Sequence, residues 1–180
     1  MTDAPGTFAA ETSASVPEPA DPAAAGLAAI GARFDHTAVA GPSMAALVAF
    51  YRDTLGGVFS HGEVLPIGAV VLTFVLGEGR IELMAPTPGS TFFDRFLAST
   101  GGRGGVHHLT FEVADIDAAV ALLHARGIET FGLVHDPDGV WSEVFVHPRT
   151  NGGVLVQLAQ IGDIASIVRR DLDALMDAAQ

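Results

Sequence analysis

One pattern occurs twice in this chain, once in each half. The segment FDHTAVAGPSMAALVAFYRDTLGG carries His36 near its start, and VHHLTFEVADIDAAVALLHARG carries His108 near its start. Each half then closes on an apolar segment, GRIELMAP with Glu82 in the first and GVLVQLAQ with Gln157 in the second. Positions 36 and 82 are separated by almost the same length of chain as positions 108 and 157. Such self-similarity predicts two copies of one structural unit that share a core.

Each copy predicts a strand, a helix and three further strands. Both expected helices have apolar residues at helical spacing, and each is preceded by a capping residue, Ser43 in the first copy and Asp115 in the second. Runs rich in Val, Phe and Leu, separated by glycine-containing turns, follow each helix. We therefore expect two tandem βαβββ modules, at residues 34–90 and 106–160, joined by a linker at 91–105.

Three further segments lie outside the modules. Residues 1–22 are rich in Ala, Pro, Ser and Thr without a sustained period, which predicts a disordered leader. Residues 23–33 predict a short helical lead-in. Residues 161–180 predict a C-terminal amphipathic helix, whose apolar stripe requires a partner surface on the same domain or on a second subunit; we expect a homodimer. The stripe consists of Ile164, Ile167, Val168, Leu172, Leu175 and Met176.

Charge and composition narrow the classes of partner. The chain has 21 acidic residues against 9 basic ones, and its formal net charge is −12. This field repels polyanions, so we expect neither a nucleic acid nor an anionic membrane as a partner. No apolar run reaches the length of a membrane span. Cysteine is absent, which agrees with a cytoplasmic location and restricts any metal site to nitrogen and oxygen ligands.

Four side chains recur at equivalent places in the two copies and predict a metal site. They are His36 and Glu82 in the first copy and His108 and Gln157 in the second. Imidazole nitrogens with carboxylate or amide oxygens suit one divalent ion such as Co, Ni, Zn, Mn or Fe. Glu82 stands between Ile81 and Leu83, where an inward carboxylate is costly unless it is paired or bound to a metal. The alternative for each residue is an ordinary strand position facing solvent or core.

Two neighbouring residues are harder to place. Strand alternation sends His107 to the face opposite His108, so we expect a structural role for it. Glu143, close to Trp141 in a late strand, is a candidate acid or base if it faces the site. A solvent-facing glutamate is the competing interpretation of that position.

Six ordered blocks carry a resemblance to a known family. The strings FDH, FYRDTLGG, IELMAP, GVHHLTFEVADIDAA, FVHPR and GVLVQLAQ resemble the vicinal oxygen chelate superfamily (glyoxalase, bleomycin resistance and dioxygenase proteins), most closely its methylmalonyl-CoA epimerase-like members. The resemblance implies an α+β fold in which the two βαβββ modules form a cup-shaped mixed sheet around a divalent metal. It also implies that His36, Glu82, His108 and Gln157 are the ligands.

The resemblance also implies two catalytic carboxylates, and this chain departs from that pattern. One glutamate is expected at position 71 and the other at position 157, but the residues there are Val71 and Gln157. An amide does not take up a proton near neutral pH. The chain therefore predicts little methylmalonyl-CoA epimerisation unless another residue, first of all Glu143, supplies the base.

Three functions remain open at the level of sequence. The first is a metal-dependent isomerase or lyase that stabilises the enolate of a small carbonyl or thioester substrate, with Glu82 or Glu143 moving the proton. The second is a non-haem iron oxygenase that uses His36, His108 and Glu82 as two histidines and one carboxylate. The third is a non-catalytic protein that binds a small molecule or confers resistance. We expect the first.

Overall fold

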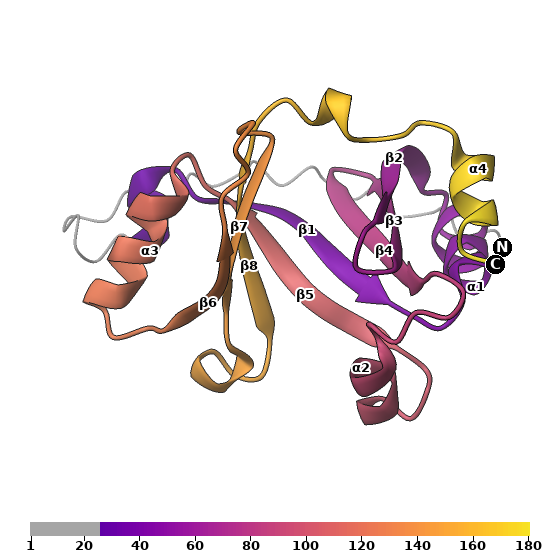
Figure 1. Ribbon diagram of the computed structural model, residues 1–180, viewed down its shortest axis with the longest axis horizontal. Coiled ribbons are helices and arrows are strands. Elements are labelled where there is room, and N and C mark those ends of the chain that lie inside the picture. The colour runs from indigo at the N-terminus through magenta and orange to yellow at the C-terminus, as the bar shows by residue number, and fades with distance from the viewer. Residues whose placement is uncertain (1–25) are drawn as a thin grey trace, which may run out of the picture.

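The computed structural model describes residues 26–180, in which one eight-stranded mixed sheet is formed (Figure 1). The strand order is β2-β3-β4-β1-β5-β8-β7-β6, so each βαβββ module occupies one half of the sheet. The predicted disordered leader, and residues 23–25 of the lead-in, lie outside the described part. The strands are β1 (Arg33–Ala40), β2 (Val58–Leu65), β3 (Ala69–Leu76), β4 (Gly79–Pro86), β5 (Gly105–Glu112), β6 (Thr130–Val134), β7 (Trp141–Val146) and β8 (Leu155–Ile161).

The sheet is symmetric about the boundary between β1 and β5. These two strands pair antiparallel, while β1 pairs parallel with β4, and β5 pairs parallel with β8. The first and last strands of each module are thus neighbours at the centre. The outer strands β2 and β3 rise on one side and β6 and β7 on the other, so the sheet curves into a cup (Figure 1). The predicted α+β fold with a cup-shaped mixed sheet is confirmed.

Each module packs its own helix against the outer face of its half of the sheet. The helix α1 (Met44–Val48) begins at Ser43, whose hydroxyl accepts a hydrogen bond from the Ala46 amide, and it continues as a π-helix over Ala49–Thr54. The helix α3 (Ile116–Ala125) begins at Asp115 in the same way. Each helix packs into its own apolar cluster, one per module. A third apolar cluster includes Val71 and Met84, which line the cup side together with polar side chains such as Glu82.

Two further helical segments lie outside the modules. Residues Gly26–Ile30 form a 3-10 helix whose Leu27 and Ile30 pack against the core of the second module. The helix α2 (Asp94–Ser99) lies in the predicted linker. No helix within residues 26–180 combines the length and the apolar character that a membrane span needs.

The prediction of one amphipathic helix over 161–180 was wrong. Strand β8 extends to Ile161, a single 3-10 turn follows at Ile164–Ser166, and α4 spans only Leu172–Asp177. The carboxylates of Asp163 and Asp171 each cap a separate helical start, which divides the segment in two. Between them, Arg169 pairs with Gly62 of β2 through two backbone hydrogen bonds of 2.9 and 2.7 Å.

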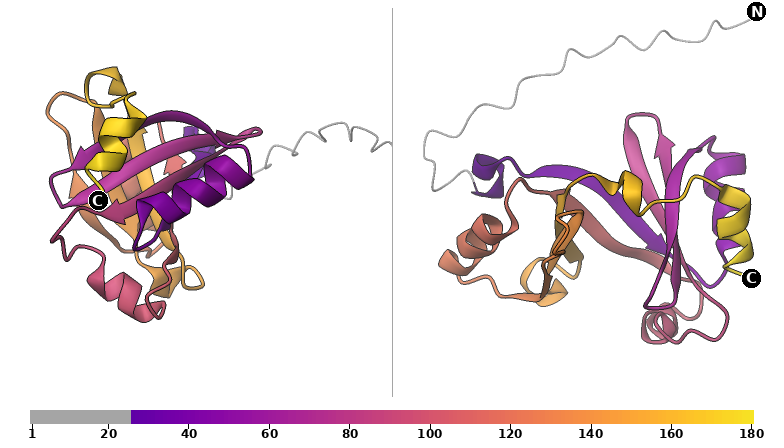
Figure 2. Two further views of the ribbon diagram at one scale, coloured as in Figure 1. Left: turned by 90° about the vertical axis from the view of Figure 1, so that its right-hand side faces the viewer. Right: turned by 45° about the horizontal axis from the view of Figure 1, so that its top comes forward.

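The apolar stripe therefore serves two surfaces of its own domain. Its first part, Ile164, Ile167 and Val168, lines the cup, whereas Leu175 of α4 is fully buried in the core of the first module. Figure 2 shows the segment from β8 to α4 crossing from one module to the other. One straight helix could not reach both places, which explains why the sequence pattern misled.

Candidate metal centre

Three of the predicted ligands meet at the bottom of the cup. His36 of β1, Glu82 of β4 and His108 of β5 each offer one donor atom, and these atoms all lie within 4.8 Å of one another. Glu82 Oε2 is 3.6 Å from His36 Nε2, and Glu82 Oε1 is 3.8 Å from His108 Nε2. Donors that bind one ion at about 2.0–2.2 Å lie roughly 3 to 4 Å apart, so small side-chain movements would complete a coordination sphere.

Strand register explains why side chains far apart in sequence converge. Ala38 of β1 is paired with Glu82 on one side and with His108 on the other. Thr110 of β5 is in turn paired with His36 on one side and with Gln157 on the other. In each of these two cross-strand rows, one small residue, Ala38 or Thr110, thus lies between two predicted ligands. Ala38 and Thr110 are themselves equivalent in the repeat, since each follows its ligand histidine by two residues.

Gln157 belongs to a hydrogen-bonded chain at the edge of this cluster. Its Oε1 accepts a hydrogen bond of 2.6 Å from Thr110 Oγ1, which is also 3.0 Å from His36 Nε2. Its Nε2 donates a hydrogen bond of 2.6 Å to Glu143 Oε2, and that same oxygen accepts a hydrogen bond of 3.0 Å from Trp141 Nε1. Glu143 therefore faces the cup, and the interpretation of it as a solvent-facing glutamate is wrong.

Burial acts on the charges of the ligands in a way that favours a cation. It raises the pKa of Glu82 to about 7; His36 opposes this shift, while the negative charges of Glu63 and Glu143 add to it. Burial also lowers the pKa of His108 to about 3, so its imidazole is neutral and able to bind a metal. His108 Nε2 is buried and has no hydrogen-bond partner within residues 26–180. A divalent ion would satisfy this nitrogen and offset the carboxylate charge, so the residues fit such an ion.

Both histidines are held from behind by the residue that precedes them. His36 Nδ1 lies 2.7 Å from Asp35 Oδ2, and His108 Nδ1 lies 2.9 Å from His107 Nδ1. Asp35 also contacts the guanidinium of Arg80. Burial would raise the pKa of Asp35, but the hydrogen bond to His36 and the charge of Arg80 outweigh it and lower the pKa.

The prediction that His107 faces away from the site was wrong. Between β1 and β5 the register skips one residue at Asp35 and one at His107, which are the extra residues of two β-bulges. A bulge suspends strict alternation, so consecutive side chains can lie on the same side. Sequence reasoning also missed Asp35 and Thr110. The signal for Asp35 was present, because it precedes His36 as His107 precedes His108.

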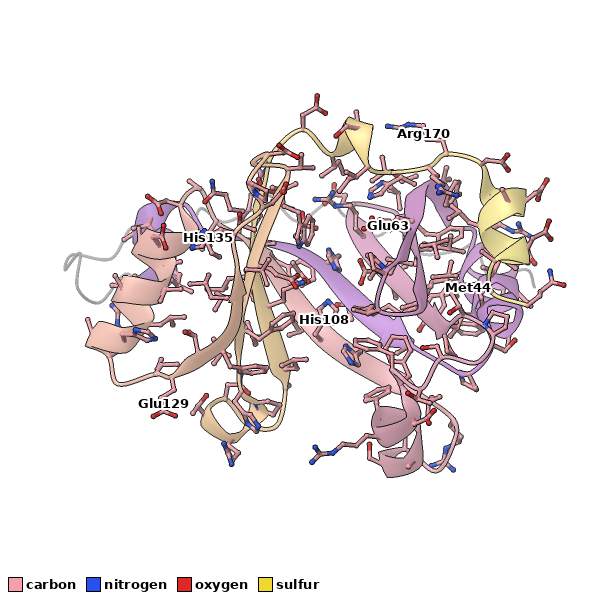
Figure 3. The ribbon with its side chains drawn as sticks, viewed as in Figure 1. Met44, Glu63, His108, Glu129, His135 and Arg170 are labelled. Atoms are coloured by element: carbon pink, nitrogen blue, oxygen red, sulfur yellow. The ribbon has the colours of Figure 1, made fainter. Side chains whose placement is uncertain are left out.

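The cup above the donors is a single cavity of about 760 Å³. Polar side chains form part of its lining, and Figure 3 shows Glu63 of β2 and His108 of β5 between the two halves of the sheet. The lining also includes the apolar side chains of Ile67, Phe92, Phe131, Ile164 and Ile167. The volume falls within the range of small-molecule sites. This mixed lining can hold a ligand that has a polar group at the donors and an apolar part against the hydrophobic side chains.

The fold and these donors define a member of the glyoxalase/bleomycin resistance protein/dioxygenase superfamily. The family model matches residues 35–145, and the chain belongs to this superfamily. Within it, the chain is similar to methylmalonyl-CoA epimerases. It is 36% identical to the mitochondrial methylmalonyl-CoA epimerase of Mus musculus over 71% of this chain and 72% of that protein.

Two further comparisons point to the same branch. The chain is 33% identical to an ethylmalonyl-CoA/methylmalonyl-CoA epimerase of Cereibacter sphaeroides, over 72% of this chain and 98% of that protein. A solved methylmalonyl-CoA epimerase in complex with methylmalonyl-CoA and NH4+ matches with a TM-score of 0.60 and 28% identity, covering 73% of this chain and 96% of the other. The resemblance predicted from the six sequence blocks is confirmed.

Strand pairing relates the two departures noted in the sequence to the two glutamates of the site. Thr73 pairs with Glu82, and Val71 lies two residues before Thr73; Phe145 pairs with Gln157, and Glu143 lies two residues before Phe145. Position 143 is therefore the counterpart of 71 in the repeat, as 82 is of 157. The resemblance leads us to expect glutamates at positions 71 and 157. This chain instead has glutamates at the equivalent positions of the opposite module, 143 and 82.

The contact between Gln157 and Glu143 makes the Gln157→Glu variant informative. In that variant two carboxylates would lie at hydrogen-bond distance, where one of them keeps a proton and adds no charge. We expect affinity for a divalent ion to rise clearly only when Glu143→Val is introduced as well. Calorimetric titration with Co(II) compares the two variants with the wild-type protein. Equal gains in the single and double variants would contradict the hydrogen-bonded pair.

Proposed function

We propose that this protein is a metal-dependent epimerase of a coenzyme A thioester that carries a carboxylate on its α-carbon, as methylmalonyl-CoA does. The observation that carries the proposal is the position of Glu82 and Glu143. They come from different modules and line one cavity, with Glu82 in the donor cluster and Glu143 hydrogen-bonded to Gln157 beside it. The relatives support the substrate class, since they are named as epimerases of methylmalonyl-CoA and of ethylmalonyl-CoA.

The reaction requires a proton to leave one face of the α-carbon and another to arrive on the opposite face. A divalent ion bound by His36, Glu82 and His108 would stabilise the negative charge of the enolate. Glu143 is suited to remove the proton because Trp141 and Gln157 both donate to its Oε2, while its Oε1 has no hydrogen-bond partner among the described residues. Those two donors fix the carboxylate and leave Oε1 available to accept a proton.

Glu82 is suited to act on the other face. One of its oxygens suffices for an ion, which leaves the other able to hold or release a proton. In one direction Glu143 takes the α-proton and Glu82 returns a proton to the opposite face. In the reverse direction the roles are exchanged, so no net proton is consumed.

The two alternative functions, a non-haem iron oxygenase and a non-catalytic binding protein, predict different behaviour of the same donors. His36, His108 and Glu82 also make up the two-histidine, one-carboxylate set of iron oxygenases. An oxygenase would consume O₂ and show activity only with iron, and a binding protein would leave the ligand unchanged. The activities named for the relatives and the presence of two carboxylates in the cup favour the epimerase.

Exchange of the α-proton with solvent tests the proposal. Purified protein loaded with Co(II) is mixed with methylmalonyl-CoA in deuterated water, and loss of the α-proton signal is followed by NMR. We expect exchange at a rate of about 1–1000 per second, as is typical of enzymes. Protein stripped of metal is the control and should exchange far more slowly. Absence of exchange by the loaded protein would overturn the proposed function.

A further inference from the structure

Two β-bulges at equivalent places in the repeat shape the back of the metal site. The extra residue is Asp35 in β1 and His107 in β5, and each directly precedes a ligand histidine. A bulge in the middle of a sheet sacrifices regular pairing, so its occurrence twice beside the same kind of residue calls for a cause. In both places the bulged side chain contacts Nδ1 of the following histidine, at 2.7 Å for His36 and 2.9 Å for His108.

We propose that Asp35 and His107 are paired positioning residues, which accept the Nδ1 protons of His36 and His108 and thereby direct both Nε2 atoms at the ion. The proposal rests on the metal site of the proposed function, but not on the reaction. A neutral imidazole carries one proton. If Nε2 binds the metal, that proton is on Nδ1 and needs an acceptor behind the ring.

The second pair is unusual because the acceptor is itself an imidazole. To accept at Nδ1, His107 must carry its own proton on Nε2. Its ring is held by edge-on contacts with Phe93 and Phe96, whose centroids lie 5.6 and 4.9 Å away. This aromatic setting keeps the orientation of His107 fixed without adding charge. The geometry thus assigns one protonation pattern to the His107–His108 pair.

The two acceptors differ in charge. Asp35 is an anionic acceptor paired with Arg80, whereas His107 is a neutral acceptor among aromatic rings. A carboxylate behind an imidazole makes the ring a better electron donor than a neutral acceptor does. His36 is therefore the stronger ligand of the two, and loss of the acceptor at Asp35 should weaken metal binding more than loss of the acceptor at His107.

Direct metal titration of four variants tests the proposal. Asp35→Ala and His107→Phe remove the acceptor, and the Phe keeps an aromatic ring in the same pocket. Asp35→Asn and His107→Gln are the matched controls that keep an acceptor oxygen. We expect the first two to weaken Co(II) binding by about 10- to 100-fold, which is typical of lost outer contacts of a metal ligand, and the controls to lose less. Circular dichroism verifies folding.

A second measurement begins with the wild-type protein. With Zn(II) bound, proton NMR of protein labelled with ¹⁵N in histidine should show two slowly exchanging Nδ1 protons, assigned to His36 and His108. Each signal should disappear in the variant that lacks its acceptor. Affinities of Asp35→Ala and His107→Phe equal to wild type, or protons found on Nε2 of both ligand rings, would overturn the proposal. Neither readout uses turnover, so an inactive protein that still shows these effects would contradict the epimerase alone.

Discussion

The Glu143→Gln variant should lose epimerisation by about 10²- to 10⁴-fold in kcat, the usual contribution of a positioned acid or base. The amide has nearly the same shape as the carboxylate but cannot accept a proton at neutral pH. Because Glu143 is not one of the three clustered donors, the variant should still bind one divalent ion. Proton exchange by NMR gives the rate, and elemental analysis gives the metal content.

A reciprocal exchange between the modules provides a strict control for this result. The quadruple variant Val71→Glu, Glu82→Gln, Glu143→Val, Gln157→Glu moves each group to its counterpart in the repeat, as defined by the strand pairing. We expect its rate of α-proton exchange to exceed that of Glu143→Gln. The same four side chains then line the cavity, with their places in the two modules interchanged. Full activity of the Glu143→Gln single variant would show that another group, with Glu63 the first to test, is the base.

The His36→Ala and His108→Ala variants should each lose tight binding of the divalent ion. Each removes one of three clustered donors, and Glu82 with a single imidazole is a weak site. Metal content measured after gel filtration should fall from one ion per chain to near zero. His135→Ala is the matched control, since this exposed histidine pairs with Asp117 outside the cup (Figure 3).

Retention of a full equivalent of metal by either variant would contradict the site. The same titration places His107 in relation to the ligands. His107→Ala should weaken binding without abolishing it, because its ring acts only through His108. Loss of all binding in His107→Ala would mean that His107 is itself a ligand.

Much of the fold was available from the repeat. A strand, a helix with its cap and three strands can be predicted from local periodicity, and duplication places equivalent residues at equivalent points of two modules. His36 and His108 in the first strands, and Glu82 and Gln157 in the last, were found in this way. The first and last strands of each module pair side by side, and the three donors meet at one point once β1 also pairs with β5.

The tertiary structure decided what surrounds those donors. Which residue is bulged depends on pairing between β1 and β5, whose partners are some 70 residues apart, and no local pattern records it. The same holds for Glu143, which turns into the cup and meets Gln157 only because β7 and β8 pair in one particular register. The C-terminal stripe likewise divides between cavity and core according to surfaces formed elsewhere in the chain. Local sequence determines elements and their faces, whereas the contacts between faces depend on register, which is a property of the assembled sheet.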